Sequence, residues 1–492
     1  MKGIGVREAR GFWAEAWSHV LSRRVAVCAL AWLCIVAFFA VFSPVLASGH
    51  PLWMRWSVNG VERSASPLWS NLRPVDLILL AWTIGGGVLI LLSPRAHRAG
   101  RAGVVLGGLL VTVIILAVAG IVQGRLAAWA IDASRQAISG SDASPGFVTT
   151  LARQWWGGYV TGGAIAALVA AAFCFAPVGR SSTRVAVCLA AALIATLAIG
   201  SRWLPPMERF DYPQREAQSQ ITATYTVIPW SPGQRFSDLV RREPLTVFGK
   251  AAGLPVESPG FDRRFILGTD AFGADVLSQI LHACRLSISI GLVSTGIALT
   301  IGIIMGALMG YFGGWIDLVL YRVVEIFMAV PVLFLLIVAV AVLPDELKTT
   351  YVIMAIIGCF TWTGMARFTR AEFLKLRNQD FVQAAEATGV PLRSILFRHI
   401  LPNGVAPVLV DASFAIAAAI AFEATLSYLG LGPVDSPSWG KLLASAISQE
   451  GEFKWWLAVF PGAAIFLTVL SYNLLGEALR DAIDPKLKKA RV

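Results

Sequence analysis

Residues 380–403 read DFVQAAEATGVPLRSILFRHILPN, a polar and charged stretch of the chain. It lies between two very apolar runs, 350–367 and 404–430. About twenty apolar residues in a helix cross the roughly 30 Å of hydrocarbon in a bilayer, so each flanking run predicts a membrane span. The polar stretch is therefore expected outside the bilayer, where another molecule can dock.

The rest of the chain repeats this alternation of apolar runs and polar segments. Of 492 residues, 56% are hydrophobic and 14% are charged, which is more apolar material than a water-soluble domain could bury. The candidate spans are 25–47, 75–93, 103–122, 157–178, 185–201, 286–311, 317–343, 350–367, 404–430 and 456–476. None has the alternating pattern of a membrane barrel. The sequence thus predicts an all-α, polytopic bundle of about ten transmembrane helices.

The basic residues predict how the chain is threaded, because Lys and Arg concentrate in cytoplasmic loops. With a cytoplasmic N-terminus and an uncleaved first span, the basic clusters that fall inside are 95–101, 180–184, 367–398 and 486–491. The arginine-rich segment 202–264 falls outside, and the rule weakens for loops longer than about sixty residues. Both termini, and residues 380–403, are therefore expected in the cytoplasm.

Composition and motifs exclude several functions. The net charge of +11 comes mostly from short loops between spans, so no nucleic-acid partner is expected. The six cysteines have neither a C-x-x-C pair nor a histidine at metal spacing, so no metal site is expected. The chain lacks G-x-x-x-x-G-K-[ST], so any ATP would be bound by another chain.

One alternative function is a membrane-embedded enzyme built on His282, Asp270 and Asp275. The sequence places no nucleophile or metal-ligand spacing beside these residues. Single His and Asp residues at a membrane edge are more often structural. No catalytic residue is therefore predicted.

Residues 380–403 divide into two short predicted helices. The first is rich in Ala and Glu and stops at Gly389, and the second leads into the next span. Phe381, Ala384 and Ala385 can share one face of the first helix, which would suit a groove on a partner protein. An amphipathic linker on the membrane surface is the other interpretation.

The same stretch resembles the EAA loop of binding-protein-dependent ABC importer permeases. The pattern of that loop is Glu-Ala-Ala, three residues, Gly, nine residues, Ile, any residue and Leu-Pro. In register with it stand Gln383 (for Glu), Ala384, Ala385, Gly389, His399 (for Ile), Leu401 and Pro402. Both replacements are familiar in the dipeptide, oligopeptide and nickel branch. The resemblance implies that this loop couples the chain to an ATPase subunit.

Three further motifs resemble the same branch. Residues 267–278, LGTDAFGADVLS, are similar to its LGTDxxGRDVLS, except that Ala274 stands where the branch usually has Arg. Residues 310–317 read GYFGGWID, and residues 423–432 and 437–440 read EATLSYLGLG and PSWG. Positions that match these motifs are Gly268, Thr269, Asp270, Gly273, Asp275, Glu423 and Trp439. The missing Arg removes a possible charge partner for the acidic turn.

The resemblance divides the chain into four parts. They are an N-terminal segment with the first span, an inserted region with four extra spans, an extracytoplasmic segment and a permease core with five spans, at 1–50, 51–205, 206–284 and 285–492. Because four is an even number, the insert leaves the coupling loop in the cytoplasm. The insert has few ionisable residues within its spans, which predicts a packing or partner-binding role.

Two patterns in the core predict local contacts. Gly302, Gly306 and Gly310 recur at four-residue spacing, which favours close approach of a neighbouring helix. Arg322 and Glu325 lie three residues apart, which favours a local ion pair.

The resemblance implies a permease subunit of an ATP-driven importer in the bacterial cytoplasmic (inner) membrane. Dipeptides or oligopeptides are the expected cargo, nickel or another small solute is the alternative, and a non-transporting scaffold on the same fold is a further one. Expected partners are a second homologous permease subunit, two cytoplasmic ATPase subunits, an extracytoplasmic substrate-binding protein and membrane lipid. ATP and Mg would lie on the partner subunits, and no cofactor is expected on this chain.

Overall fold

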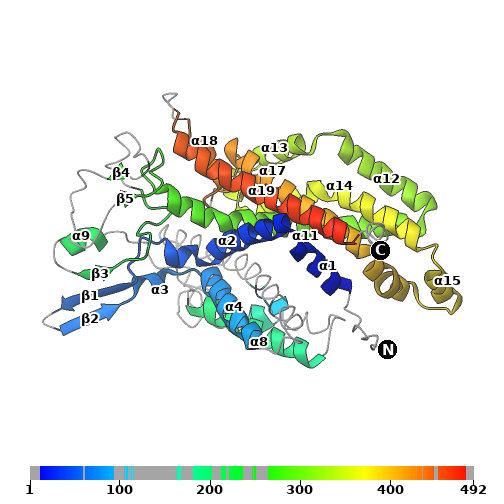
Figure 1. The fold of residues 1–492 in the computed structure, drawn as a ribbon, viewed down its shortest axis with the longest axis horizontal. Helices are drawn as coiled ribbons and strands as arrows, with labels where there is room; N and C mark the ends of the chain where they lie inside the picture. Colours follow the sequence, from blue (N-terminus) through cyan, green and yellow to red (C-terminus); the bar gives the residue numbers. More distant parts are fainter. Residues whose placement is uncertain are drawn as a thin grey trace, which may run out of the picture. The chain divides into compact units, whose positions relative to one another are not determined.

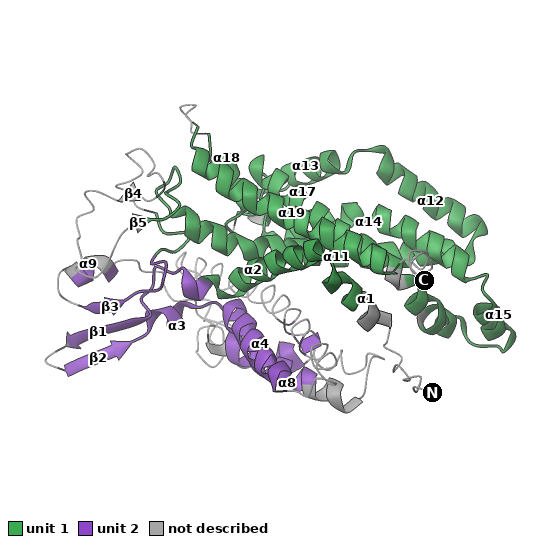
Figure 2. Cartoon of the chain, in the orientation of Figure 1, with its two compact units in different colours: residues 1–43, 230–255, 260–492 green, residues 44–229, 256–259 purple. Residues whose placement is uncertain are grey.

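The computed structural model (Figure 1) describes residues 12–58, 61–92, 105, 107–108, 112, 115, 163–167, 181–201, 212–217, 221–235, 247, 249–250, 264–434, 436–447 and 453–483. Its contacts separate two compact units (Figure 2). Unit 1 comprises residues 1–43, 230–255 and 260–492, and unit 2 comprises residues 44–229 and 256–259. The four predicted parts of the chain, 1–50, 51–205, 206–284 and 285–492, were defined by membrane topology and not by contacts. This division therefore stays a prediction.

Unit 1 is mainly helical. Its helices are α1 (Phe12–Ser22), α2 (Arg24–Leu46, whose end lies in unit 2), α11 (Val276–Phe312), α12 (Gly314–Ala329), α13 (Val332–Ala341), α14 (Thr350–Leu376), α15 (Asp380–Ala387), α16 (Leu392–Ser394), α17 (Leu401–Tyr428), α18 (Trp439–Ala444) and α19 (Trp455–Ile483). A 3₁₀ turn, η2 (Asp345–Leu347), precedes α14, and a π-helical turn, η3 (Ile395–Ile400), joins α16 to α17. Two short antiparallel strands, β4 (Gly249–Lys250) and β5 (Arg264–Phe265), precede α11.

Six described helices are long and apolar enough to cross a membrane: α2, α4 (Pro74–Leu91), α11, α14, α17 over Pro407–Tyr428, and α19. Helices α12 and α13 pass the same test together, but they are bent by 79° at the break before Pro331. Such a break is expected at proline, which disfavours helical conformation in the residue before it. The chain is thus a multi-span helical membrane protein. The predicted runs 103–122 and 157–178 lie mostly outside the described residues, so the number of about ten spans stays a prediction.

Unit 2 combines helices with a small sheet. Its elements are α3 (Pro67–Asn71), α4, α8 (Ser181–Ser201), α9 (Tyr212–Ala217), β1 (Trp53–Val58), β2 (Val61–Ala65) and β3 (Thr222–Thr224). The strands are antiparallel in the order β2-β1-β3, with Trp56 opposite Arg63 and Met54 opposite Ala223. Helices α4 and α8 share an apolar core that includes Ile78, Ala191 and Ala195.

The prediction of an all-α fold is correct for the described spanning helices. It is wrong for the five described strands, which form two small sheets. The sequence did carry a signal for the β1–β2 hairpin. Asn59-Gly60 separates the two strands, and this dipeptide is favoured in two-residue hairpin turns. The long apolar runs predict spanning helices more strongly than this dipeptide predicts a hairpin, because a span has about twenty apolar residues and a strand only a few residues.

The centre of unit 1 is the packing of α11 on α14. At Gly306 an added Cβ would lie 2.5 Å from Ala366 O, and at Gly310 it would lie 2.6 Å from Phe373 Cβ. Gly302 meets Met365 in the same way. The prediction that the spaced glycines allow close helix approach is therefore confirmed.

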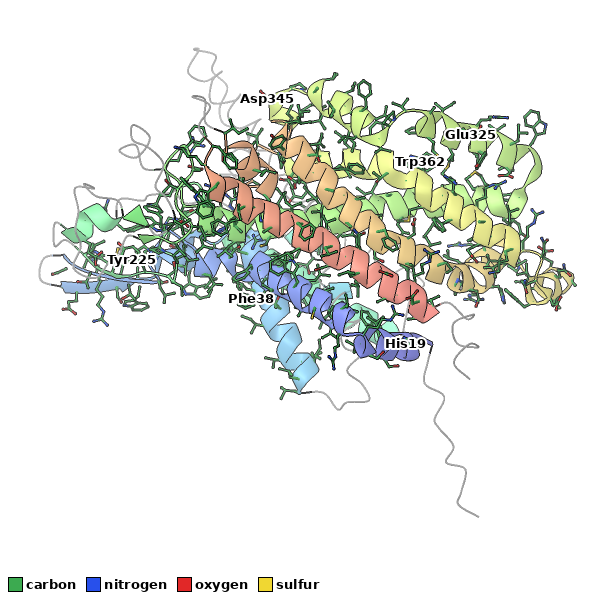
Figure 3. The ribbon with its side chains drawn as sticks, turned by 45° about the horizontal axis from the view of Figure 1, so that its top comes forward. His19, Phe38, Tyr225, Glu325, Asp345 and Trp362 are labelled. Carbon is green, nitrogen blue, oxygen red and sulfur yellow. The ribbon has the colours of Figure 1, made fainter. Side chains whose placement is uncertain are left out.

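Helix α12 lies beside α14 and carries the predicted ion pair. Arg322 Nη1 lies 2.6 Å from Glu325 Oε2, which confirms that prediction. The rings of Phe327 and Trp362 meet edge to face at 5.5 Å, between the two helices. Figure 3 labels Glu325 of α12 and Trp362 of α14.

Replacement of Gly306 by Ala is expected to destabilise the chain by about 1–3 kcal/mol, because the new methyl would overpack the α11–α14 contact. Gly296→Ala on the same helix is the matched control, since no atom lies within 4 Å of the added Cβ there. Ala favours helix over Gly by about 1 kcal/mol, so the control should be neutral or slightly more stable. Thermal unfolding of the purified chain in detergent measures both. Equal melting temperatures for the two variants would contradict the prediction.

Candidate functional site

Helix α15 is held against the bundle by one face. Val382 and Ala385 are buried with Phe373 of α14 and with Ile395 and Ile400 of η3. The opposite face is exposed, and the first predicted helix, 381–388, is observed one residue earlier, as Asp380–Ala387.

The exposed face of α15 differs in one member from the predicted one. Phe381 is 40% exposed, and Gln383 and Ala384 are exposed as well. Ala385, which was predicted to share this face, points inward instead, because Val382 and Ala385 are three residues apart and lie on the same side of the helix. The surface of α15 available to a partner therefore includes Phe381, Gln383 and Ala384, together with Glu386.

Gly389 ends α15 in a left-handed conformation, with φ of +73°. The amide of Val390 donates to Ala385 O at 3.0 Å, and the amide of Gly389 donates to Glu386 O at 3.0 Å. These two bonds form a Schellman motif, which uses glycine because a Cβ disfavours positive φ. The predicted stop at Gly389 is confirmed, and the chain is turned there toward α17.

The return to the bundle passes through a π-helical turn. His399 lies half-buried in η3, and its carbonyl accepts a bond of 2.7 Å from Asn403 Nδ2. Leu401 and Pro402 open α17, where proline is tolerated because the first helical amides have no partner within the helix. Single π-helical turns occur often at functional sites.

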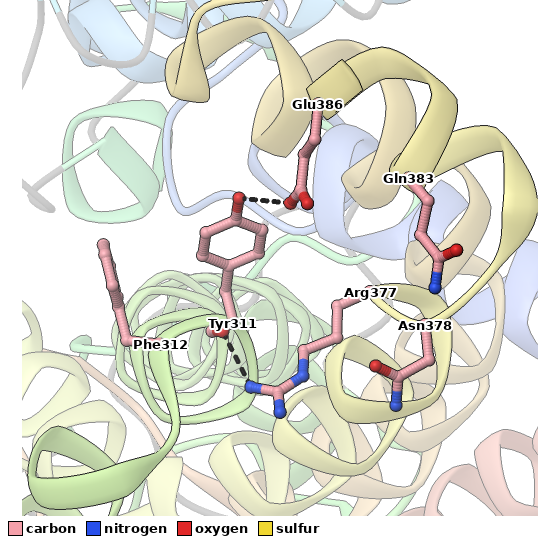
Figure 4. A pocket seen from close by; sticks show the side chains of 6 residues that line it. All are labelled: Tyr311, Phe312, Arg377, Asn378, Gln383 and Glu386. Atoms are coloured by element: carbon pink, nitrogen blue, oxygen red, sulfur yellow. Dashed lines mark hydrogen bonds between the residues drawn. The ribbon is translucent and has the colours of Figure 1, made fainter.

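A cavity of about 350 Å³ lies beside α15, at the end of α11 (Figure 4). Its walls are Tyr311, Phe312, Arg377, Asn378, Gln383 and Glu386. The Tyr311 hydroxyl donates to Glu386 Oε1 at 2.9 Å, and Arg377 Nη1 donates to the carbonyl of Tyr311 at 2.9 Å. Gln383, which stands in place of the family's Glu, thus faces both the exposed surface and this cavity. Sequence spacing could not reveal the Tyr311–Glu386 bond, since the two residues are 75 positions apart.

At the other end of α11, residues 267–278 form a closed turn. Asp270 Oδ1 accepts from the amides of Phe272 and Ala274, each at 2.9 Å, and its Oδ2 accepts from Gln279 Nε2 at 2.7 Å. Gly268 and Gly273 supply the positive φ angles, 77° and 75°. The carboxylate is therefore satisfied by amides and needs no Arg at the buried position Ala274.

Asp275 begins α11 from the same turn. Its Oδ2 accepts from the amide of Ser278 at 2.7 Å, as an N-cap, and Thr269 bridges to it across the turn. Trp456 of α19 donates from Nε1 to Thr269 O at 3.2 Å. Asp270, Asp275 and Thr269 thus close the start of α11. His282 lies one turn further along, with Nδ1 2.9 Å from Ser278 O.

Burial raises the pKa of Asp275 from its ordinary 3.8 to about 7, although the amides of Ser278 and Leu277 act in the opposite direction. The charge of Asp270 adds to the increase. The carboxyl is therefore neutral in part at physiological pH.

Glu423 and Trp439 meet through a short helix, α18. Glu423 is 1% exposed, and its Oε1 accepts from Ser427 Oγ at 2.6 Å and from Ser438 Oγ at 2.7 Å. Ser438 also caps α18 by accepting from the Gly440 amide at 3.1 Å. Trp439 Nε1 donates to Ile280 O of α11 at 3.1 Å. The two motif positions therefore anchor α18 between α17 and α11.

The predicted residues fall into two groups, one near each end of α11, which is 37 residues long. Gln383, Ala384, Ala385 and Gly389 lie near its C-terminal end, and the family-motif positions lie near its N-terminal end. The hypothetical enzyme residues Asp270 and Asp275 are engaged by backbone amides in this turn. Among the described residues, no group of three or more His, Cys, Asp or Glu side chains could hold a metal ion.

Comparison with known proteins identifies the class. Residues 299–489 match the family described as the inner membrane component of binding-protein-dependent transport systems. The chain is 38% identical over 265 residues to a di/tripeptide transport system permease protein, DppC, of Pseudomonas aeruginosa, covering 54% of this chain and 82% of that one. It is 38% identical over 234 residues to a dipeptide permease protein, DppC, of Alkalihalophilus pseudofirmus (47% and 75%). It is 39% identical over 230 residues to an oligopeptide permease protein, OppC, of Haemophilus influenzae (46% and 73%).

The chain therefore belongs to the inner-membrane permease components of binding-protein-dependent transport systems. The family consists of transport components, not of enzymes. The matched region begins within α11 and includes the whole of α15, η3 and α17. The resemblance inferred from the motifs is thus confirmed.

Because the pKa of Asp275 is raised by folding, its neutral form favours the folded state. This stabilisation is complete below pH 4 and declines as pH rises toward about 7, above which both states are ionised. The melting temperature of the wild-type chain, relative to that of Asp275→Asn, should therefore fall between pH 5 and 7 and then level off. A difference that is constant or rises over this interval would contradict the assignment. Asn keeps an oxygen that can accept from Ser278, so the N-cap itself is retained.

Proposed function

We propose that this chain is a permease subunit of an ATP-driven importer that carries peptides across the bacterial cytoplasmic membrane. The observation that carries the proposal is α15, whose exposed face of Phe381, Gln383 and Ala384 stands clear of the spans while its other face is packed into them. A short rigid helix of this kind can pass a movement of its partner to the helices that follow it. The relatives' names supply the cargo, since they are dipeptide, di/tripeptide and oligopeptide permeases.

The family to which the chain belongs implies its partners. Two cytoplasmic ATPase subunits bind ATP and Mg, and one of them receives α15 in a groove. A second homologous permease subunit completes the pore, because the sequence contains a single coupling loop. A substrate-binding protein delivers cargo from outside, and lipid surrounds the spans. The chain itself carries no cofactor and binds no nucleic acid.

The proposed topology has about ten spans and both termini in the cytoplasm, which places α15 inside and the turn at 267–278 outside. The basic clusters support this orientation. Residues 51–205 are an added region with four extra spans, and residues 206–284 are extracytoplasmic and contribute to the face that receives the binding protein. Transport then follows alternating access, in which ATP-driven closure of the ATPases shifts the population of permease conformations.

Two alternatives remain distinguishable by experiment. Cells that contain the complete transporter should accumulate a labelled tripeptide, and accumulation of nickel without peptide would favour the small-solute alternative. A complex that assembles without ATPase stimulation by any loaded binding protein would favour a non-transporting scaffold.

Replacement of Gly389 by Val is expected to abolish uptake while the protein stays in the membrane. A β-branched residue at φ of +73° costs about 1–2 kcal/mol or more and would change the exit of the chain from α15. No atom lies within 4 Å of an added Cβ there, so the effect would be conformational and not steric.

Gly389→Asn is the matched control, because Asn tolerates positive φ better than other residues with a Cβ. It should keep most of the uptake. Normal peptide uptake by the Val variant, at equal amounts in the membrane, would count against α15 as the coupling element.

A further inference from the structure

The motif at 310–317, GYFGGWID, forms a corner between α11 and α12 that is fastened to α14. Gly313 and Gly314 make the turn with φ of 65° and 53°. Asp317 Oδ1 and Oδ2 accept from Arg370 Nε and Nη2 of α14, at 2.5 and 2.6 Å. A two-bond contact of this kind fixes orientation as well as distance.

A second arginine holds the end of α11. Arg377 Nη1 donates to the carbonyl of Tyr311 at 2.9 Å, which is one of the last carbonyls of the helix. An added Cβ at Gly313 would lie 2.9 Å from the same Nη1, so the corner and the arginine are in close contact. Together with the glycine contacts between α11 and α14, these bonds make the corner a fixed part of the bundle.

Tyr311 joins this fixed corner to α15. Its hydroxyl donates to Glu386 Oε1 at 2.9 Å (Figure 4). Tyr311 is also partly buried against the cluster that includes Phe373, Val382 and Ala385. The cavity of about 350 Å³ lies next to this bond. A hydrogen bond is lost when its atoms separate by about 1 Å, so a displacement of α15 from α11 by more than that breaks it.

The strength of the bond suits a switch better than a structural support. Glu386 is exposed, and an exposed bond to a carboxylate shifts an equilibrium by only about two- to tenfold. The fold of α15 depends on the buried residues Val382 and Ala385, which a change at Glu386 leaves in place. A shift of this size is enough to change the populations of two positions of α15.

We propose that the Tyr311–Glu386 hydrogen bond is a latch that holds α15 in its resting position against the end of α11 and breaks when the ATPase subunits close. Tyr311 and Glu386 are thus positioning residues for the transport cycle. The proposal rests on the function proposed above, because it assigns a role within ATPase coupling. The GYFGGWID motif then holds Tyr311 in place at a fixed corner of the bundle.

The test uses the complete transporter in proteoliposomes, with both permease subunits and the ATPases. Tyr311→Phe removes the hydroxyl and keeps the ring, and Glu386→Ala removes the acceptor. Each is expected to raise ATP hydrolysis without binding protein by about two- to tenfold and to lower peptide transported per ATP. The double variant should match the single variants, because both remove the same bond. Glu386→Gln keeps an acceptor oxygen and should have a smaller effect.

Glu325→Ala is the matched control, since it also removes an exposed glutamate that bonds one side chain. That partner is Arg322, which lies on the same helix, α12, so no contact between helices is lost. It should leave basal ATP hydrolysis unchanged. Unchanged basal hydrolysis in Tyr311→Phe, or a decrease in both basal and stimulated hydrolysis, would overturn the latch. Failure of the wild-type complex to respond to a loaded binding protein would instead overturn the proposed function, so the two failures are distinguishable.

Discussion

The close contact between α11 and α14 is the constraint on which the rest of unit 1 depends. Its glycines let two long helices approach so closely that an added Cβ at Gly306 or Gly310 would meet backbone or Cβ atoms. Contacts of this kind hold helices together in membranes, where lipid removes most of the hydrophobic driving force. Because α15 follows α14 after a short connection, the contact between α11 and α14 also sets the position of α15.

The two ends of α11 carry different kinds of polar structure. At its start, buried carboxyls of Asp270 and Asp275 are satisfied mainly by backbone amides, which closes a rigid turn. At its end, Arg377 joins the carbonyl of Tyr311 to the end of α14, and the Tyr311 hydroxyl donates to Glu386 of α15. Buried and fully bonded groups give rigidity, whereas exposed bonds of modest strength can break and form again. This difference fits the proposed latch, in which α11 is anchored at one end and holds α15 at the other.

Much of the fold and of the candidate site could be predicted because their signals are local. Apolar runs predicted α2, α4, α11, α14, α17 and α19, and Gly389 predicted the end of α15. The hairpin of β1 and β2 was missed although Asn59-Gly60 lies between its strands, since short strands have weak periodic signals. The inward position of Ala385 was missed because neighbouring residues of a short helix lie on adjoining faces, and the sequence does not show which face is buried. The packing of Val382 and Ala385 with Phe373 decides it.

The sequence by itself determined that this protein is a multi-span helical membrane protein with a polar segment at 380–403 between two spans, because hydrophobicity and local turn chemistry act over neighbouring residues. It also determined the family, through motifs in order along the chain. Only the tertiary structure decided which partners the residues of those motifs meet: Tyr311 meets Glu386, Asp317 meets Arg370, and Glu423 meets Ser438. The physical reason is that each pair joins different elements, and their distance is set by helix packing that no local pattern records.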